Sequence, residues 1–246
     1  MLRGGPGINL PGQWNSWYHI GTNSRKKFRA NASFSMSDGD FGHSSYRGAG
    51  IDFIYRPINA LEIAFMPDFS IGHNKLQYID SYQDQGEAHY VLGNIKRVTT
   101  DFTLRLDYAI TPEMTLQYYG SPFIASGKYS DFKHVTSPRA SDYKQRFALY
   151  SQDEISLQDD EYHIDKNQDG EMEYSFGIPD FNFKQFRSNM VFRWEYSPGS
   201  LLYLVWSQSR TETNDFGSFQ FQRDFDNLFH SFPKNVFLVK LSYMLS

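Results

Sequence analysis

Five residues with side-chain oxygens in segment 165–173 have the types and spacing of a calcium-binding loop. Asp165, Asn167 and Asp169 alternate with other residues and are followed by Gly170, which gives the pattern D-x-N-x-D-G. A hard cation takes about six to eight oxygen ligands, and glycine permits the sharp turn that gathers them. We therefore predict a structural Ca²⁺ site that orders this loop. Its ligands would be Asp165, Asn167, Asp169, Glu171 and Glu173.

The pattern departs from an EF-hand at its far end. An EF-hand carries a bidentate glutamate at its twelfth position, where this chain has Phe176. The loop is therefore not an EF-hand, and a solvated acidic turn stays open as the alternative to a calcium site.

A second acidic cluster could supply the carboxylate pair of a glycosidase. Such enzymes place two carboxylates about 5–10 Å apart, and the cluster holds Asp153, Glu154, Asp159, Asp160 and Glu161. Acidic runs are more often solvated loops. The chain has no cysteine, and it has neither an H-E-x-x-H nor a G-x-S-x-G motif. The sequence therefore favours a protein that is not an enzyme.

Charged residues also alternate with apolar ones in several strand-length segments. In a β-strand, successive side chains point to opposite faces, so this alternation places charge on one face and an apolar band on the other. If the charged face lines a barrel lumen, its ions can pair across strands in water. The predicted lumen network consists of Arg29, Glu62, Asp68, Arg105, Asp107, Arg187, Arg193 and Glu195. It could form a substrate path or a structural salt-bridge network.

The elements that position these residues are nine predicted strands joined by connections of two kinds. The connections at 23–25, 56–59, 111–113 and 197–200 are short, whereas the alternate ones are mostly longer and polar. The longest is an insertion over 125–183. Short turns at one end and long loops at the other are typical of an outer-membrane barrel. We predict an all-β fold: an antiparallel up-and-down transmembrane β-barrel of about nine or ten strands with long extracellular loops.

Composition agrees with this prediction. Aromatic residues make up 17% of the chain although charged residues reach 21%, and barrels carry aromatic girdles at both membrane interfaces. No run of about 18 apolar residues is present, which excludes a transmembrane helix. The formal net charge of -4 makes nucleic acid an unexpected partner.

The ends of the chain bear on its completeness. The last strand, 235–246, is amphipathic and has an aromatic residue near its end. In both respects it resembles the signal that barrel-assembly machinery recognises. Segment 1–7 lacks the apolar core of a signal peptide, and bacterial barrels have even strand numbers. We therefore expect a single barrel domain over 1–246 that is incomplete at its N-terminus, with an upstream part of the same protein as its partner.

Several motifs resemble a Gram-negative outer-membrane family. They include Pro179-Asp180-Phe181-Asn182-Phe183, Arg193-Trp194-Glu195-Tyr196, Gln117-Tyr118-Tyr119-Gly120-Ser121 and Arg3-Gly4-Gly5-Pro6. Members of that family carry an N-terminal module resembling a family-nine carbohydrate-binding domain, followed by a large domain of unknown function. The resemblance implies that this chain is the C-terminal barrel portion, with a link to carbohydrate binding or uptake.

We therefore expect a non-enzymatic surface or transport-like domain in the outer membrane of a Gram-negative bacterium, in contact with membrane lipid. The alternative is a soluble all-β domain that binds or hydrolyses glycans. In that alternative the aromatic face packs a protein core.

Overall fold

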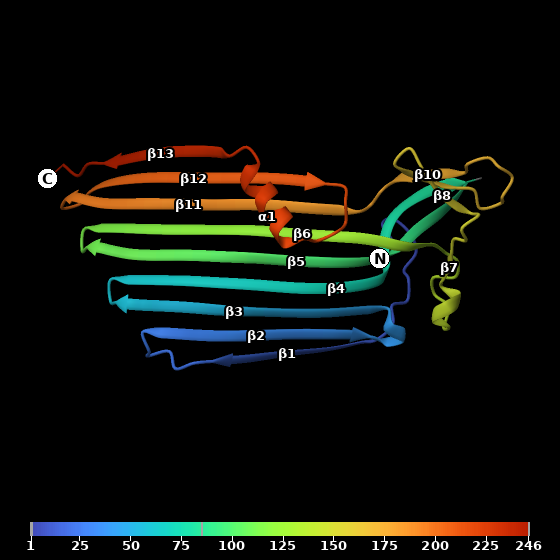
Figure 1. Cartoon of the computed structure of the whole chain (residues 1–246), viewed down its shortest axis with the longest axis horizontal. Helices are drawn as coiled ribbons and strands as arrows, with labels where there is room; N and C mark the ends of the chain where they lie inside the picture. Colours follow the sequence, from blue (N-terminus) through green and yellow to red (C-terminus); the bar gives the residue numbers. More distant parts are fainter. Residues whose placement is uncertain (1, 85, 246) are drawn as a thin grey trace.

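The computed structural model describes residues 2–84 and 86–245, and most of these residues form one large antiparallel sheet (Figure 1). The sheet has ten strands in the order β1-β2-β3-β4-β5-β6-β11-β12-β13, and β7 pairs with β6. The strands are β1 (Gln13–Gly21), β2 (Phe28–Gly39), β3 (Ser44–Ile58), β4 (Leu61–Asp84), β5 (Glu87–Thr111), β6 (Met114–Val135), β7 (Phe147–Leu149), β11 (Phe181–Ser197), β12 (Ser200–Asn214) and β13 (Lys234–Ser242). The 3₁₀ turns η1 (Asp40–Gly42) and η2 (Tyr143–Gln145) lie in its connections.

The sheet is open among the residues described. β1 is bonded only to β2, and β13 only to β12, so two strand edges have no neighbour in the described part of the chain. The prediction is confirmed as a mostly β fold with one large antiparallel sheet, whereas the described residues form no closed barrel. A single sheet of this size leaves two edges and two faces to be covered, because only closure or pairing removes an edge.

One end of the sheet has only short turns, whereas the other end has two short connections, 40–43 and 85–86, and two long ones. The turns after β1, β3, β5 and β11 are short and lie together at the left of Figure 1, beside the C-terminus. The β11–β12 turn is possible because Gly199 has φ +74°, a backbone conformation that side chains with a Cβ rarely adopt. The long connections, 136–180 and 215–233, begin at the opposite end.

Three strands are longer than the sequence predicted. β4 and β5 form one long hairpin in which β4 runs to Asp84 and β5 begins at Glu87; Gln85 lies outside the described residues. β6 continues to Val135, so the first part of the insertion predicted over 125–183 is also strand. Apolar residues fall on both faces here, since this end of the sheet is covered on both sides, and two-sided burial removes the alternation that marks a half-exposed strand.

The remainder of the insertion forms a small sheet of its own. β8 (Ile155–Gln158), β9 (Glu161–Ile164) and β10 (Tyr174–Gly177) pair as three antiparallel strands. The fully buried Ile164 lies in one core with Val91 of β5 and Phe132 of β6. The rings of Tyr82 and Tyr174 stack with centroids 4.4 Å apart. This packing fixes the small sheet on the extended ends of β4–β6.

One α-helix of the described residues, α1 (Phe221–His230), lies in the connection between β12 and β13, where the sequence had not predicted a helix. Phe221, Phe225 and Phe229 recur at a spacing of four residues, which places them on one side of a helix. They pack on the sheet over β6, β11 and β12 (Figure 1). No helix in segments 2–84 and 86–245 is long and apolar enough to cross a membrane.

Candidate functional site

The pairing register divides the sheet into a polar face and an apolar face. Because side chains alternate along each strand, the registers assign every position to one face. Glu62 lies opposite Asp107, and Arg105 lies opposite Tyr119, which faces Asn189 of β11. All eight residues of the predicted charge network lie on this polar face: Arg29, Glu62, Asp68, Arg105, Asp107, Arg187, Arg193 and Glu195.

Only some of these eight residues contact one another. Glu62 accepts a hydrogen bond from Arg29 Nη2 at 3.0 Å and also pairs with Arg56, which the sequence analysis did not include. Arg193 Nη2 lies 3.1 Å from a carboxylate oxygen of Glu195. These are two local clusters near the short turns. Both are partly exposed, so solvent screens these ion pairs.

The other four residues have neutral partners or none. Gln117 donates a hydrogen bond of 2.9 Å to Asp107, and the Arg105 guanidinium lies over the Tyr119 ring, 5.4 Å from its centroid. The side chains of Asp68 and Arg187 make no hydrogen bond or ion pair with any described residue. Hollows of about 280 to 470 Å³ lie between the side chains of the sheet. The polar face is thus a loosely paired, open surface rather than a sealed network.

The apolar face is left uncovered over most of its area. Ile20 is 74% exposed and Phe237 75% exposed, at opposite edges of the sheet. In the middle of the sheet, Phe65 and Leu104 lie opposite each other and are also exposed. Further exposed members of this face are Trp14, Tyr18, Phe28, Phe34, Ile51, Tyr55, Phe69, Ile110, Trp194, Leu204, Val239 and Leu241. Monomeric soluble proteins rarely expose apolar patches above a few hundred Å².

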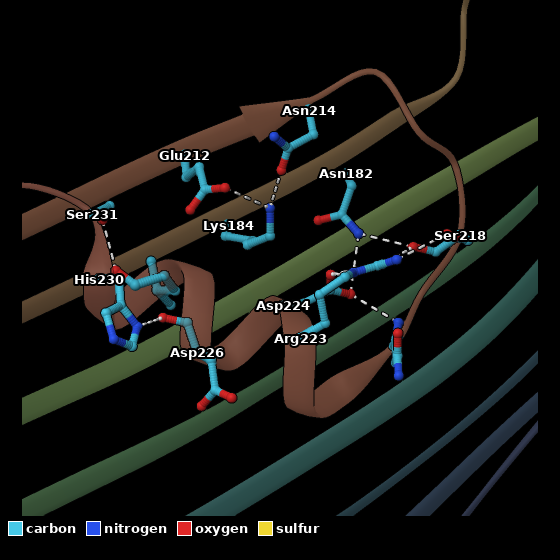
Figure 2. A network of polar contacts seen from close by, with 12 residues as sticks. Asn182, Lys184, Glu212, Asn214, Ser218, Arg223, Asp224, Asp226, His230 and Ser231 are labelled. Atoms are coloured by element: carbon cyan, nitrogen blue, oxygen red, sulfur yellow. Dashed lines mark hydrogen bonds and ion pairs between the residues drawn. The ribbon is translucent and has the colours of Figure 1, made fainter.

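A buried polar cluster fastens α1 to this apolar face (Figure 2). Lys184 is fully buried, and its Nζ lies between Glu212 (3.4 Å) and Asn214. Asp224, also fully buried, accepts hydrogen bonds from Asn182 Nδ2 at 3.1 Å and from Arg223 Nε at 2.8 Å. The cluster joins β11 and β12 to the helix, so α1 is a fixed part of the sheet rather than a loose connection.

At the far end of β6, a buried amine stabilises the junction of the extended strands. Lys133 is 3% exposed and donates to the Lys75 carbonyl at 2.8 Å and to Asn94 Oδ1 at 2.7 Å. Burial lowers its pKa to about 8, with the nearby Lys75 charge acting in the same direction and Asp131 opposing it. Lys133 was not among the predicted site residues, because lysine side chains are rarely buried.

In the predicted calcium loop, side-chain oxygens accept hydrogen bonds from backbone N–H groups of the same loop. Asp165 accepts hydrogen bonds from the backbone N–H of Asp169 (3.2 Å) and Gly170 (3.0 Å), and Asp169 accepts one from Glu171 (2.8 Å). Glu173 accepts from the backbone of Lys166 at 2.6 Å, whereas Asn167 bonds with Asp169. Within the described residues, no three His, Cys, Asp or Glu side chains are grouped to hold a metal ion. The calcium site therefore stays a prediction.

The second acidic cluster has local structural roles. Asp159 and Asp160 form the turn between β8 and β9 with φ of 48° and 64°, a conformation that Asp tolerates better than most residues. Glu154 accepts a hydrogen bond of 2.7 Å from the backbone of Ser151, which lowers its pKa. These contacts show that Asp159, Asp160 and Glu154 stabilise local turns.

The fold and these faces define a large antiparallel β-sheet protein with one polar face and one exposed apolar face. A family model described as "Domain of unknown function (DUF5916)" matches residues 4–246, and the chain belongs to this family. Neither a curated protein nor a solved structure matched the chain.

Proposed function

We propose that this chain forms part of the wall of a β-barrel in the outer membrane of a Gram-negative bacterium. Its apolar face contacts lipid, and its polar face lines a water-filled lumen. The short turns lie in the periplasm and the long connections lie outside the cell. The domain is a non-enzymatic surface or transport-like component, and its link to carbohydrate rests on resemblance alone.

The one-sided exposure of apolar side chains carries this proposal. On β4 the apolar face runs from Leu61 to Ile71, and on β11 from Phe186 to Tyr196. Each run matches the roughly 9–11 residues that a tilted strand needs to cross a bilayer. Aromatic residues border the band near the short turns, as in the girdles of outer-membrane barrels. The bordering residues are Phe28, Tyr55, Tyr108, Trp194, Tyr196 and Tyr243.

The charged face supports the same orientation. An ion facing lipid is expensive, whereas an ion facing a hydrated lumen is not. Asp68 and Arg187 have no described partner, which is tolerable only where water reaches them. A soluble glycan-binding domain would instead need a second layer over the apolar face. The segment with α1 covers the part of this face over β6, β11 and β12, and its Phe219 and Phe221 also contact Phe69 of β4 and Phe102 of β5.

A closed wall needs a partner strand on the edge of β1 and on the edge of β13, because both edges are free in the described residues. Strands from another segment of the same protein, paired with both edges, would complete the wall. Closed barrels are also the only sheet structures that satisfy every backbone group in lipid.

Electrophoresis of the full protein after detergent extraction from membranes tests the proposal. A barrel should migrate differently in unheated and boiled samples, since it resists unfolding by detergent until it is heated. Boiled and unheated samples of a water-soluble protein prepared in parallel serve as the control. Recovery of the protein as a detergent-free monomer would contradict the proposal.

A further inference from the structure

The polar face contains a cavity of about 580 Å³ at the end of the sheet opposite the short turns. This volume is within the range of small-molecule sites. Its floor is formed by β3, β4 and β5, and one side is closed by the N-terminal segment 2–10. That segment is fastened at both ends. Leu2 is buried with Leu76 and Leu92, and the Asn9 carbonyl accepts a hydrogen bond of 2.8 Å from Arg146.

A row of three residues across the floor shapes the cavity. Tyr46, Gly72 and Arg97 are directly paired on β3, β4 and β5. Gly72 has no side chain, so the space between the Tyr46 ring and the Arg97 guanidinium is open. A Cβ built there would meet nothing closer than 3.6 Å. The result is a slot with an aromatic ring on one side and a cation on the other.

The charges around the cavity are all of one sign. Its lining includes Arg3 and Arg97, and no Asp or Glu is found among the described residues that line it. Arg3 lies over the Tyr78 ring, 5.6 Å from its centroid. Arg97 is exposed and makes no hydrogen bond or ion pair with any described residue. Its planar donors are therefore available to bind a carboxylate or phosphate in a bidentate manner.

The rest of the lining consists largely of hydroxyl and amide groups. Ser70 and Thr99 face each other in the next row, and Asn74 and Gln77 lie further along β4. Such groups donate and accept hydrogen bonds, and they suit a ligand that carries several hydroxyls.

From this arrangement we propose that the cavity binds a small hydroxylated anion. The ligand's carboxylate or phosphate lies at Arg97, its body fills the space over Gly72 against Tyr46, and its hydroxyls bond to the serine, threonine and amide side chains. Binding at this site does not depend on which face of the sheet contacts lipid, so it can be measured on detergent-solubilised protein.

Isothermal titration of the purified full chain at low salt with glucuronate, glucose 6-phosphate and glucose tests the site. At least one of the two anions should bind, at least tenfold more tightly than glucose, because a charge-assisted bidentate contact is lost with the neutral sugar. Preference between the carboxylate and the phosphate identifies the anionic group. Absence of binding by both anions, or equal binding of glucose, would overturn the proposal.

Variants locate the binding within the cavity. Arg97→Gln should weaken anion binding at least tenfold, and Gly72→Val should weaken it by filling the slot. Arg105→Gln is the matched control, since Arg105 lies on the same face of the same strand but does not line the cavity, and it should bind as the parent does. Unaltered binding in a folded Arg97→Gln or Gly72→Val protein, verified by circular dichroism, would overturn the assignment.

Discussion

Substitution of Leu104 by arginine tests the orientation of the sheet quantitatively. Leu104 lies on the apolar face in the middle of β5, opposite Phe65 and Gly120, and is 39% exposed. If lipid covers this face, Leu104→Arg places a cation near the bilayer midplane, which costs about 2–4 kcal/mol. If water covers it, the same substitution at a partly exposed site changes stability by roughly 0.5 kcal/mol or less.

The neighbouring position provides the matched control. Thr103 lies on the polar face and donates one hydrogen bond of 3.2 Å to Ser121. Thr103→Arg removes that bond, worth about 0.5–1.5 kcal/mol, and places its charge in the hydrated lumen. Urea unfolding in lipid vesicles, followed by tryptophan fluorescence, measures both changes in the free energy of unfolding. Equal effects of the two substitutions would refute the assignment of the faces.

Three further predictions concern the polar cluster at α1, the buried Lys133 and the acidic loop. Asp224→Ala removes the acceptor of hydrogen bonds from Asn182, Arg223 and the Gln220 backbone. It should destabilise the fold by about 3 kcal/mol and speed hydrogen exchange in 221–230, whereas Asp226→Ala on the exposed side of the helix should do neither. Slow exchange in both variants would show that the cluster does not hold α1 in place. Because burial lowers the pKa of Lys133 to about 8, below its unfolded value, the folded state binds fewer protons and the melting temperature should rise from pH 8 towards pH 10. Above about pH 10 the raised pKa values of Tyr150 and Tyr174 oppose this rise in melting temperature. If the melting temperature of Lys133→Met still rises between pH 8 and pH 10, another group causes the effect. If the acidic loop binds calcium, Ca²⁺ should slow proteolysis within 150–180, and Asp165→Asn but not Asp153→Asn should abolish that protection; insensitivity of the parent to chelator would eliminate the site.

The two faces of the sheet were predictable because alternation with a period of two fixes them. A slip of one residue would exchange the faces, so Arg29, Arg105 and Arg193 had to share one side once their strands were recognised. The short turn at 197–200 was predictable because Pro198 and Gly199 mark it directly. The turn predicted at 56–59 lies instead at 59–60, because β3 continues through Pro57 to Ile58.

The remaining features depend on contacts between distant segments. The outer ends of β4–β6 are buried on both sides, which hides their alternation. Helix α1 is short, and its Gln220 N-cap offers no side-chain cap bond, so only the spacing of Phe221, Phe225 and Phe229 could have indicated it. The cavity lies between segment 2–10 and three strands that are distant from it in the sequence, so no local sequence pattern could predict it.

Spin labelling along β5 tests the central claim most directly, and the absence of cysteine from the chain makes single-cysteine variants straightforward. Labels at Thr103, Leu104, Arg105 and Leu106 would be measured in lipid vesicles for their collision rates with oxygen and with a water-soluble nickel complex. A lipid-facing apolar side predicts that oxygen relaxes the labels at 104 and 106 more strongly, whereas nickel relaxes those at 103 and 105. Labels at 104 and 106 that are equally accessible to nickel, or shielded from both reagents, would contradict the account.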